Sequence, residues 1–211
     1  MEILYFDTLP STQRYIIEKL KKEDTELPLA VLAKEQSDGL GSRDNKWSGG
    51  RGNYFASIAV DISRLPKDLP LSSASIYFSF IMKQTLEDMG LNVWLKWPND
   101  FYSNNDKVGG TITNKIKNTL VCGIGINLNN SQNGYRTLQS DISSEILLKE
   151  YIYRLKQYPK WKQVFSDYRV EFELSRKFSV HIENNKKSLS QAVLCSDGSL
   201  LIDKEKVYSL R

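Results

Sequence analysis

The stretch KWPND (residues 96–100), followed by KVGG (residues 107–110), is the most informative part of this chain. The first motif places a cation, a carboxamide and a carboxylate around a proline, and the second places a lysine beside two glycines. The exterior of an ordinary strand does not need this mixture. Lysines neutralise anions, glycines let a ligand approach the backbone, and a carboxylate can hold a magnesium ion. The stretch therefore indicates a site for a carboxylate and a nucleotide phosphate, beside a hairpin-like run.

Strands are predicted around this stretch from runs rich in β-branched and aromatic residues. These runs cover residues 3–6, 29–33, 53–60, 93–97, 108–113 and 120–128. Turn residues at 104–106 and 117–118 separate the last three runs, which therefore predict an antiparallel meander.

Three helices are predicted between the strands, each beginning at a serine that can serve as N-cap. The capping residues of the first three helices are Ser11, Ser72 or Ser73, and Ser143 or Ser144. We expect the first helix to end near Lys22, the second at Gly90 and the third at Pro159. A fourth, short helix is predicted over residues 161–168.

The irregular order of helices and strands predicts an α+β fold, with helices packed on a mixed, largely antiparallel sheet, and not a doubly wound sheet. After about Arg176 the pattern changes to short strands with polar turns. We therefore expect a main domain over residues 1–175 and a small β domain over residues 176–211.

Composition excludes several classes of protein. No apolar run approaches the roughly 18 residues of a membrane span, and the N-terminus lacks a basic segment followed by an apolar one. Cys122 and Cys195 are far apart, so we expect reduced thiols in a cytoplasmic protein. His181 is the only histidine, which excludes a Cys/His zinc site. The net charge of +4 is spread along the chain, so no specific DNA binding is expected.

Four motifs together resemble the biotin–protein ligases. KWPND followed by Lys-x-x-Gly is one of them. Residues 36–47 (QSDGLGSRDNKW) resemble the family's biotinyl-adenylate loop, and residues 123–127 (GIGIN) resemble its Gly-x-Gly-Ile-Asn strand. Residues 11–13 (STQ) resemble its Ser-Thr-Asn opening. The four motifs also follow the order in which the family has them.

The resemblance implies a class II synthetase-like fold with a small C-terminal SH3-like β-barrel, in a single-function ligase without an N-terminal DNA-binding domain. The implied reaction uses ATP and Mg²⁺ to activate biotin as biotinyl-5′-AMP. Biotin then passes to one lysine of a biotin carboxyl carrier domain, such as that of acetyl-CoA carboxylase. The oligomeric state, monomer or homodimer, stays open.

The resemblance also assigns a biotin site. Gln36 and Ser11 each offer a donor and an acceptor, which suits a ureido ring with one carbonyl and two N–H groups. Ser11 is alternatively a simple helix cap, or both. Trp97 is expected in the core and as a wall of the pocket. The full set is Ser11, Thr12, Gln13, Gln36, Gly39, Leu40, Gly41, Ser42, Trp97, Lys107, Gly110, Gly123 and Gly125.

The nucleotide site implied by the resemblance lies beside it. Lys107 is the best catalytic candidate, because an ammonium group stabilises the charge that grows when a carboxylate attacks a phosphate. Arg43 is the second candidate. Asp100 is a candidate Mg²⁺ ligand or a turn cap, and Lys96 serves the phosphates or shields Asp100. The implied adenylate-binding residues are Arg43, Lys46, Trp47, Lys96, Asn99, Asp100 and Asn127.

The glycine-rich loop departs from the family pattern Gly-Arg-Gly-Arg-x-Gly-Arg-x-Trp. Leu40, Ser42 and Asn45 stand at the three arginine positions, and Arg43 is the only arginine in the loop. Two rival functions therefore stay open. One is a lipoate–protein ligase or octanoyl transferase of the same fold, and the other is a non-catalytic biotin-binding module. A P-loop is excluded, because no Gly-x-x-x-x-Gly-Lys-Ser/Thr is present.

Overall fold

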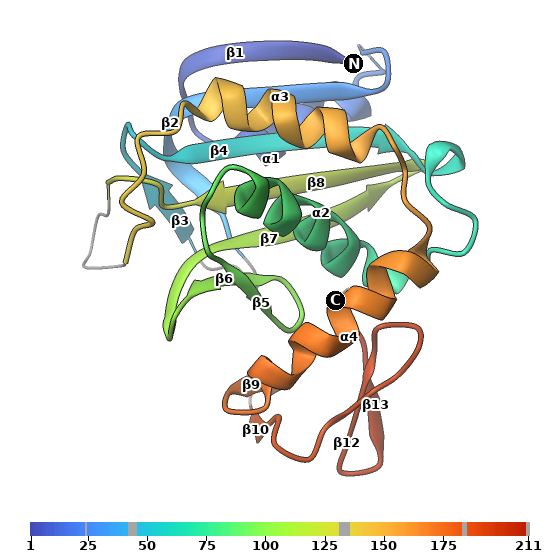
Figure 1. The fold of residues 1–211 in the computed structure, drawn as a ribbon. Helices are drawn as coiled ribbons and strands as arrows, with labels where there is room; N and C mark the ends of the chain where they lie inside the picture. The colour runs from blue at the N-terminus through green and yellow to red at the C-terminus, as the bar shows by residue number, and fades with distance from the viewer. Residues whose placement is uncertain (24, 42–45, 131–135, 183–184, 210–211) are drawn as a thin grey trace.

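Two neighbouring strands, β4 (Tyr54–Asp61) and β8 (Thr119–Ile126), form the buried middle of the protein (Figure 1). The computed structural model describes residues 1–23, 25–41, 46–130, 136–182 and 185–209. All residues of β4 before Asp61 are buried. A strand without alternation between apolar and polar residues needs cover on both faces of its sheet, and helices supply that cover here.

One eight-stranded sheet contains both strands. Its order is β1-β2-β4-β8-β7-β6-β5, and β3 pairs with β2. The pair β1–β2 is parallel, and all other pairs are antiparallel. The remaining bounds are β1 Glu2–Leu9, β2 Leu29–Leu40, β3 Lys46–Gly49, β5 Trp94–Lys96, β6 Asp100–Ser103 and β7 Asp106–Ile116.

Helices cover the two faces of the sheet unequally. α2 (Ala74–Asp88) and α3 (Ser144–Leu155) lie on one face, and α1 (Thr12–Lys21) lies on the other (Figure 1). The core under α1 is small, with Ile16 packed near the sheet residues Val31 and Val121. The larger core lies under α2 and α3. None of the described helices is long and apolar enough to cross a membrane.

The predicted α+β class is confirmed, with differences in detail. The meander contains a strand that was not predicted, β6, between β5 and β7, so the three predicted runs are not consecutive neighbours. The fourth helix, α4 (Trp161–Ser175), extends beyond the predicted residue 168. Two 3₁₀ turns, Ile62–Arg64 and Leu71–Ser73, precede α2.

Only one of the predicted serine caps makes its hydrogen bond to the helix. Ser11 accepts from the backbone N–H of Arg14 at 3.3 Å. Ser73 and Ser143 lie at the N-cap positions of α2 and α3 without such a bond. Ser73 donates instead to the carbonyl of Asp197, so it links α2 to the C-terminal segment.

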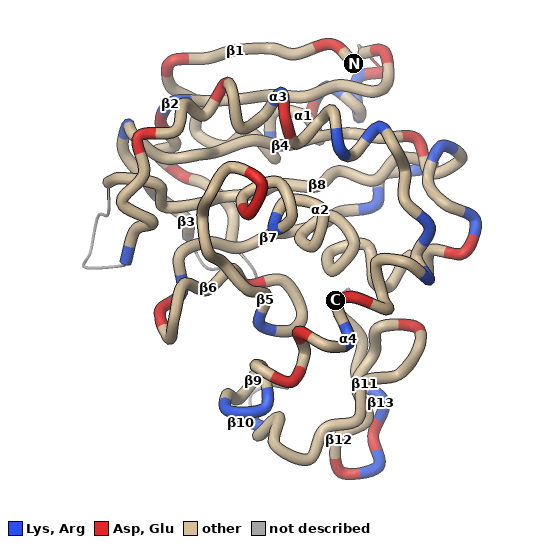
Figure 2. The backbone as a smooth tube through the Cα atoms, viewed as in Figure 1, with Lys and Arg blue, Asp and Glu red and all other residues tan. Residues whose placement is uncertain are grey.

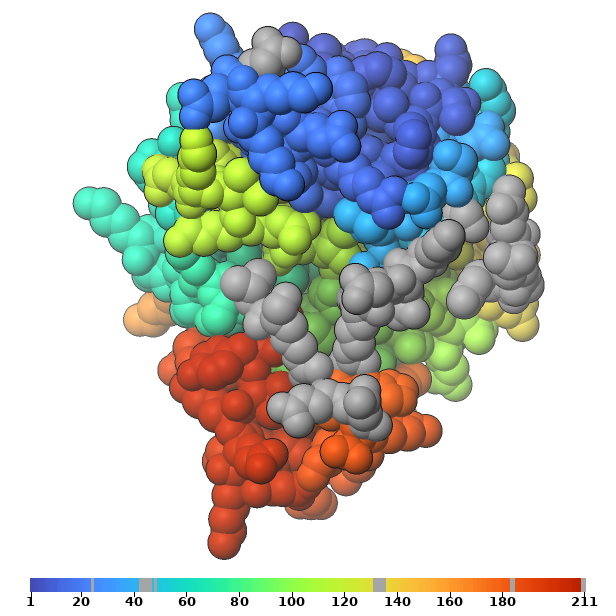
Figure 3. All heavy atoms as spheres, turned by 180° about the vertical axis from the view of Figure 1, so that it is seen from behind, coloured from blue at the N-terminus to red at the C-terminus, as the bar shows by residue number. Residues whose placement is uncertain are grey.

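The described C-terminal strands form two small sheets and not a closed barrel. One sheet pairs β9 (Ser179–Ile182) with β10 (Asn185–Ser188). The other contains β11 (Val193–Leu194), β12 (Leu200–Ile202) and β13 (Glu205–Val207). These residues form one end of the molecule, red in the rear view (Figure 3), yet their apolar side chains join the larger core. The domain boundary at residue 176 stays a prediction.

Charged residues are spread over the described chain. Lysines and arginines are distributed over many elements together with acidic residues, and the short strand β10 carries two adjacent lysines (Figure 2). The absence of specific DNA binding stays a prediction from the sequence.

The edge strand β5 is held by α4 through side chains. Glu171 accepts a hydrogen bond from the backbone N–H of Leu95, and Ser175 accepts one from the backbone N–H of Trp97 at 3.1 Å. Glu171 and Ser175 lie one helical turn apart, so they reach alternate N–H groups on the outer edge of β5. Glu171 also pairs with Lys83 of α2 at 2.8 Å. Burial raises the pKa of the Glu171 carboxyl, and its partners lower it.

We expect Glu171→Ala to lower the free energy of unfolding by about 2 kcal/mol, because it leaves the Leu95 N–H without its acceptor and Lys83 with Glu87 as its remaining carboxylate partner. Urea titration followed by circular dichroism would measure the change. Glu23→Ala is the matched control, since Glu23 pairs with Lys117 on the exposed surface. Equal effects of the two substitutions would contradict the anchoring role of Glu171.

Candidate functional site

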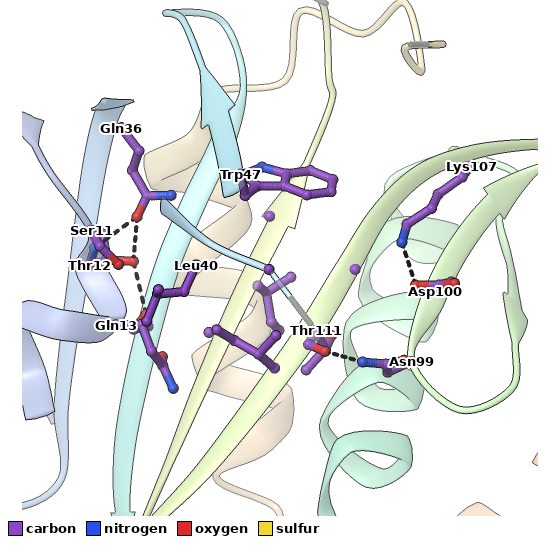
Figure 4. Close-up of a pocket in the computed structure, with 17 residues that line it drawn as sticks. Ser11, Thr12, Gln13, Gln36, Leu40, Trp47, Asn99, Asp100, Lys107 and Thr111 are labelled. Atoms are coloured by element: carbon purple, nitrogen blue, oxygen red, sulfur yellow. Dashed lines mark hydrogen bonds and ion pairs between the residues drawn. The ribbon is translucent and has the colours of Figure 1, made fainter. Parts of the chain in front are cut away.

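A pocket opens beside the N-terminus of α1, on the part of the α1 face of the sheet that the helix does not cover. It has about 460 Å³ of space not occupied by protein atoms, part of it open to solvent. Its lining residues are Ser11, Thr12, Gln13, Gln36, Leu40, Gly41, Trp47, Ser57, Asn99, Asp100, Lys107, Gly110, Thr111, Ile112, Gly123, Ile124 and Gly125 (Figure 4).

The floor of the pocket is formed where two successive positions of β8 that face the pocket, Gly123 and Gly125, are glycines. Side chains of a strand alternate between faces, so Val121, Gly123 and Gly125 share one face. Val121 packs under α1, whereas Gly123 and Gly125 contribute no side chain to the sheet surface near the start of α1, so their backbone lines the pocket. A Cβ at Gly125 would lie 2.7 Å from Nε1 of Trp47, so the indole of Trp47 covers this position.

One end of the pocket is polar and uncharged. Gln36 Oε1 accepts from the backbone N–H of Thr12 at 2.7 Å and from Thr12 Oγ1 at 3.0 Å. Thr12 Oγ1 also lies 2.9 Å from Ser57 Oγ. Both groups of Thr12 donate to the side-chain oxygen Oε1 of Gln36. The side-chain nitrogen Nε2 of Gln36 therefore points away from Thr12 (Figure 4). These side chains are all buried, so a ligand there must supply matching polar groups.

The opposite end is charged. Lys107 on β7 places its Nζ 2.6 Å from Asp100 Oδ1, at the start of β6. Lys96 Nζ lies 3.8 Å from Asp100 Oδ2, so the carboxylate lies between two ammonium groups. Asn99 fixes the turn before β6, since its Nδ2 donates to the Thr111 carbonyl and its own carbonyl accepts from Thr111 N–H at 2.9 Å. This end carries a net positive charge and suits an anion.

The pocket brings together most of the site residues predicted from sequence, from segments far apart in the chain. Ser11 is both a helix cap and a lining residue, as the sequence allowed. The predicted residues that line the pocket are Ser11, Thr12, Gln13, Gln36, Leu40, Gly41, Trp47, Asn99, Asp100, Lys107, Gly110, Gly123 and Gly125.

Four predicted residues lie outside the lining. The indole of Trp97 is buried in the core and donates to the Gly198 carbonyl at 2.9 Å, so it joins β5 to the C-terminal segment. The side chain of Asn127 donates to the Arg136 carbonyl at 3.3 Å and so contacts the segment that follows β8. Gly39 allows close packing, because a Cβ there would lie 2.2 Å from the Trp47 carbonyl oxygen. Lys96 lies over the Tyr102 ring, beside Asp100.

Part of the predicted loop cannot be placed. Ser42 and Arg43 lie outside the described residues, and so do Asp44 and Asn45. Lys46 belongs to β3 by its backbone, but its side chain is not among those described.

Four lining residues were missed from sequence. Ser57 gave a usable signal, since it is the one hydroxyl residue in the otherwise apolar run of β4 after Tyr54. Thr111, Ile112 and Ile124 gave none, because they look like ordinary strand residues and only the pairing of β7 with β8 brings them to the pocket.

A metal ion held by the protein itself does not fit the described residues. Within that part of the chain, no three His, Cys, Asp or Glu residues come together as a possible metal site. Asp100 is already paired with Lys107 and Lys96. A nucleotide-bound Mg²⁺ takes most of its ligands from phosphates and water, so it does not require this carboxylate.

Comparison with known proteins agrees with this geometry. Residues 5–130 match the biotin/lipoate A/B protein ligase family. The solved structure of biotin acetyl coenzyme A carboxylase synthetase from Helicobacter pylori, with biotinylated ATP bound, is 37% identical. The similarity covers 98% of this chain and 99% of that chain, with a TM-score of 0.93.

Two curated relatives are more distant and longer. The bifunctional ligase/repressor BirA of Bacillus subtilis is 27% identical over 154 residues, which are 68% of this chain and 46% of BirA. The biotin–protein ligase of Homo sapiens is 27% identical over 139 residues, which are 61% of this chain and 19% of the human protein. The matches thus cover less than half the length of these relatives.

The two adjacent glycines of β7 should respond differently to a methyl group. A Cβ at Gly109 would lie 2.6 Å from the Gly125 carbonyl oxygen, so Gly109→Ala should destabilise the protein by about 2 kcal/mol. A Cβ at Gly110 meets atoms no closer than 3.6 Å, so Gly110→Ala should change stability by less than about 0.5 kcal/mol. Denaturant titration compares them, and a larger loss for Gly110→Ala would contradict this packing.

Proposed function

Because the chain belongs to the biotin/lipoate A/B protein ligase family, we propose that it activates biotin with ATP and transfers it to a carrier protein. The observation that carries the proposal is the polarity of one pocket, which is neutral and hydrogen-bonding at the Gln36 end and cationic at the Lys107 end. Biotin has the same division, with a ureido ring at one end and a carboxylate at the other.

The neutral end supports biotin over lipoate as the substrate. A ureido ring has one acceptor and two N–H donors, which can pair with the buried amides and hydroxyls of Gln13, Gln36 and Thr12. A dithiolane ring has no such groups. It would leave buried polar atoms without partners, at a cost of about 1–3 kcal/mol for each.

The charged end supports an adenylation step. A carboxylate oxygen of biotin attacks the α-phosphorus of ATP, pyrophosphate leaves, and biotinyl-5′-AMP forms. Two anions must approach, and the Lys107 ammonium reduces their repulsion and stabilises the charge that grows on the phosphate. Asp100 keeps this ammonium at the pocket in the free protein, and a ligand anion then takes its place as the partner of Lys107.

The second step needs positioning more than a protein nucleophile. The ε-amine of a carrier lysine attacks the carbonyl carbon of biotinyl-5′-AMP, and AMP leaves with the electron pair of the broken bond. A biotin carboxyl carrier domain, such as that of acetyl-CoA carboxylase, is the proposed acceptor. Arg43 and Lys46 stay predicted phosphate contacts.

The proposed activity can be tested directly. We expect biotin-dependent exchange between pyrophosphate and ATP, with no exchange above background when lipoate replaces biotin. Mass spectrometry should detect biotinyl-5′-AMP and, after addition of a biotin carboxyl carrier domain, a biotinylated lysine. Exchange that depends on lipoate alone would assign the chain to the other branch of the family.

Lys107→Ala should slow pyrophosphate exchange on the order of 10²–10³-fold, because it removes the ammonium group that stabilises the transition state. Lys115→Ala is the matched control, since Lys115 is an exposed residue of the same strand and lies outside the pocket. Exchange at the wild-type rate in a folded Lys107→Ala protein would remove Lys107 from catalysis.

A further inference from the structure

The strand β2 contains a β-bulge directly after Gln36. Gln36 pairs with Gly49, and Gly39 pairs with Trp47, so three steps along β2 match only two steps along β3. One extra residue of β2 is therefore inserted between Gln36 and Gly39. A bulge interrupts the alternation of side chains between the two faces of a strand, so it decides which of the following residues face the pocket.

The bulge exchanges a carboxylate for a glycine opposite Trp47. Without the extra residue Asp38 would pair with Trp47, and directly paired residues of antiparallel strands share one face. The carboxylate would then lie on the face of Gln36 and Trp47, which both line the pocket. Gly39 takes this position instead, where a Cβ would lie 2.2 Å from the Trp47 carbonyl oxygen and 2.6 Å from Gln36 Nε2. The bulge thus keeps a side chain and a negative charge out of the pocket.

The start of α1 holds the bulge from outside the pocket. The backbone N–H of Asp38 donates to the Pro10 carbonyl at 2.9 Å. The Asp38 carboxylate forms an ion pair with the guanidinium of Arg14 in α1. Directly before the bulge, the backbone N–H of Thr12 donates to Gln36 Oε1 at 2.7 Å. The same short segment of chain therefore contacts β2 both before the extra residue and within the bulge.

The ion pair between Arg14 and Asp38 lies at the surface. Its side chains are 43% and 40% exposed, and pairs at such exposure contribute little to the stability of a whole protein because water screens them. A weak pair can still select between two strand registers that differ little in free energy. Here it favours the register in which the Asp38 carboxylate points out of the pocket and toward α1.

We propose that Arg14 and Asp38 are positioning residues, whose ion pair holds the bulge that sets Leu40 and Trp47 in place for the ligand. The inference rests on the proposed function and adds two residues that lie outside the lining of the pocket. Leu40 and Trp47 do line it, and the Trp47 indole covers the backbone of Gly125. The effect of the ion pair reaches the ligand through these two side chains.

The first measurement is calorimetric titration with biotin of two charge reversals and their combination. Arg14→Glu and Asp38→Arg each replace the attraction by a repulsion, so each should weaken biotin binding about fivefold to tenfold. The double variant Arg14→Glu/Asp38→Arg restores the pair in the opposite orientation and should bind within about twofold of wild type. Lys117→Glu is the matched control, since it reverses the exposed pair with Glu23 beyond the other end of α1, and it should bind as wild type.

The second measurement needs no ligand. Acrylamide quenching of Trp47 fluorescence is obtained as the difference between each protein and the same protein with Trp47→Phe. We expect quenching to rise in both single reversals, to return in the double variant, and to stay unchanged in Lys117→Glu. The midpoint of urea unfolding should change little in all four proteins, so a general loss of stability would not imitate this pattern.

Unchanged quenching in the single reversals, or a loss of affinity that the double variant does not reverse, would overturn the proposal. If a reversal does not fold, Arg14→Gln and Asp38→Asn remove the attraction without adding a repulsion and should shift both measurements in the same direction. Absence of biotin binding to the wild-type protein would instead reject the proposed function, and the quenching series would still decide whether the ion pair positions Trp47.

Discussion

On one face of the central strand β8, two successive positions carry no side chain, and the binding site depends on this constraint. α2 and α3 cover one face of the sheet, and α1 covers part of the other. Gly123 leaves room for the side-chain oxygen Oε1 of Gln13, and Gly125 leaves room for the Trp47 indole. A larger residue at either position would fill the floor, because the strand backbone is fixed by hydrogen bonds to β4 and β7.

The two ends of the pocket obtain their polarity by different means. At the neutral end, hydrogen bonds within the protein decide which atom of each amide faces the ligand. At the charged end, Asp100 separates two lysines and reduces their mutual repulsion while keeping Lys107 Nζ at the pocket. The first arrangement discriminates between ligands of similar size, because unpaired buried groups are costly. The second attracts anions and places the ammonium group that we propose for the adenylation step.

Local sequence was sufficient for some parts of the structure and insufficient for others. The long apolar runs and Gly90 predicted β4, β8 and the end of α2, because these depend on local composition and backbone freedom. β6 escaped prediction, since only four residues form it, although it pairs with β7 across a two-residue turn. The motifs located Lys107 and Gln36, whereas Ile112 and Ile124 are ordinary strand residues until tertiary pairing places them. Trp97 was expected in the core and as a wall of the pocket, and its buried indole lies in the core and donates to the Gly198 carbonyl.

The charged end lies at the least protected side of the sheet, and this explains the contacts made by α4. Asn99 and Asp100 follow β5, an edge strand of only three residues, and such strands present backbone groups that can fray or pair with other chains. Glu171 and Ser175 occupy the free N–H groups at Leu95 and Trp97, and the Trp97 indole adds a bond to Gly198. The position of Asp100 relative to Lys107 is therefore supported by residues that never contact a ligand. The lysine that we propose for catalysis must be held in place to act on a developing charge, so α4 and the C-terminal segment support the proposed site by fixing β5, the strand that precedes the charge partner Asp100.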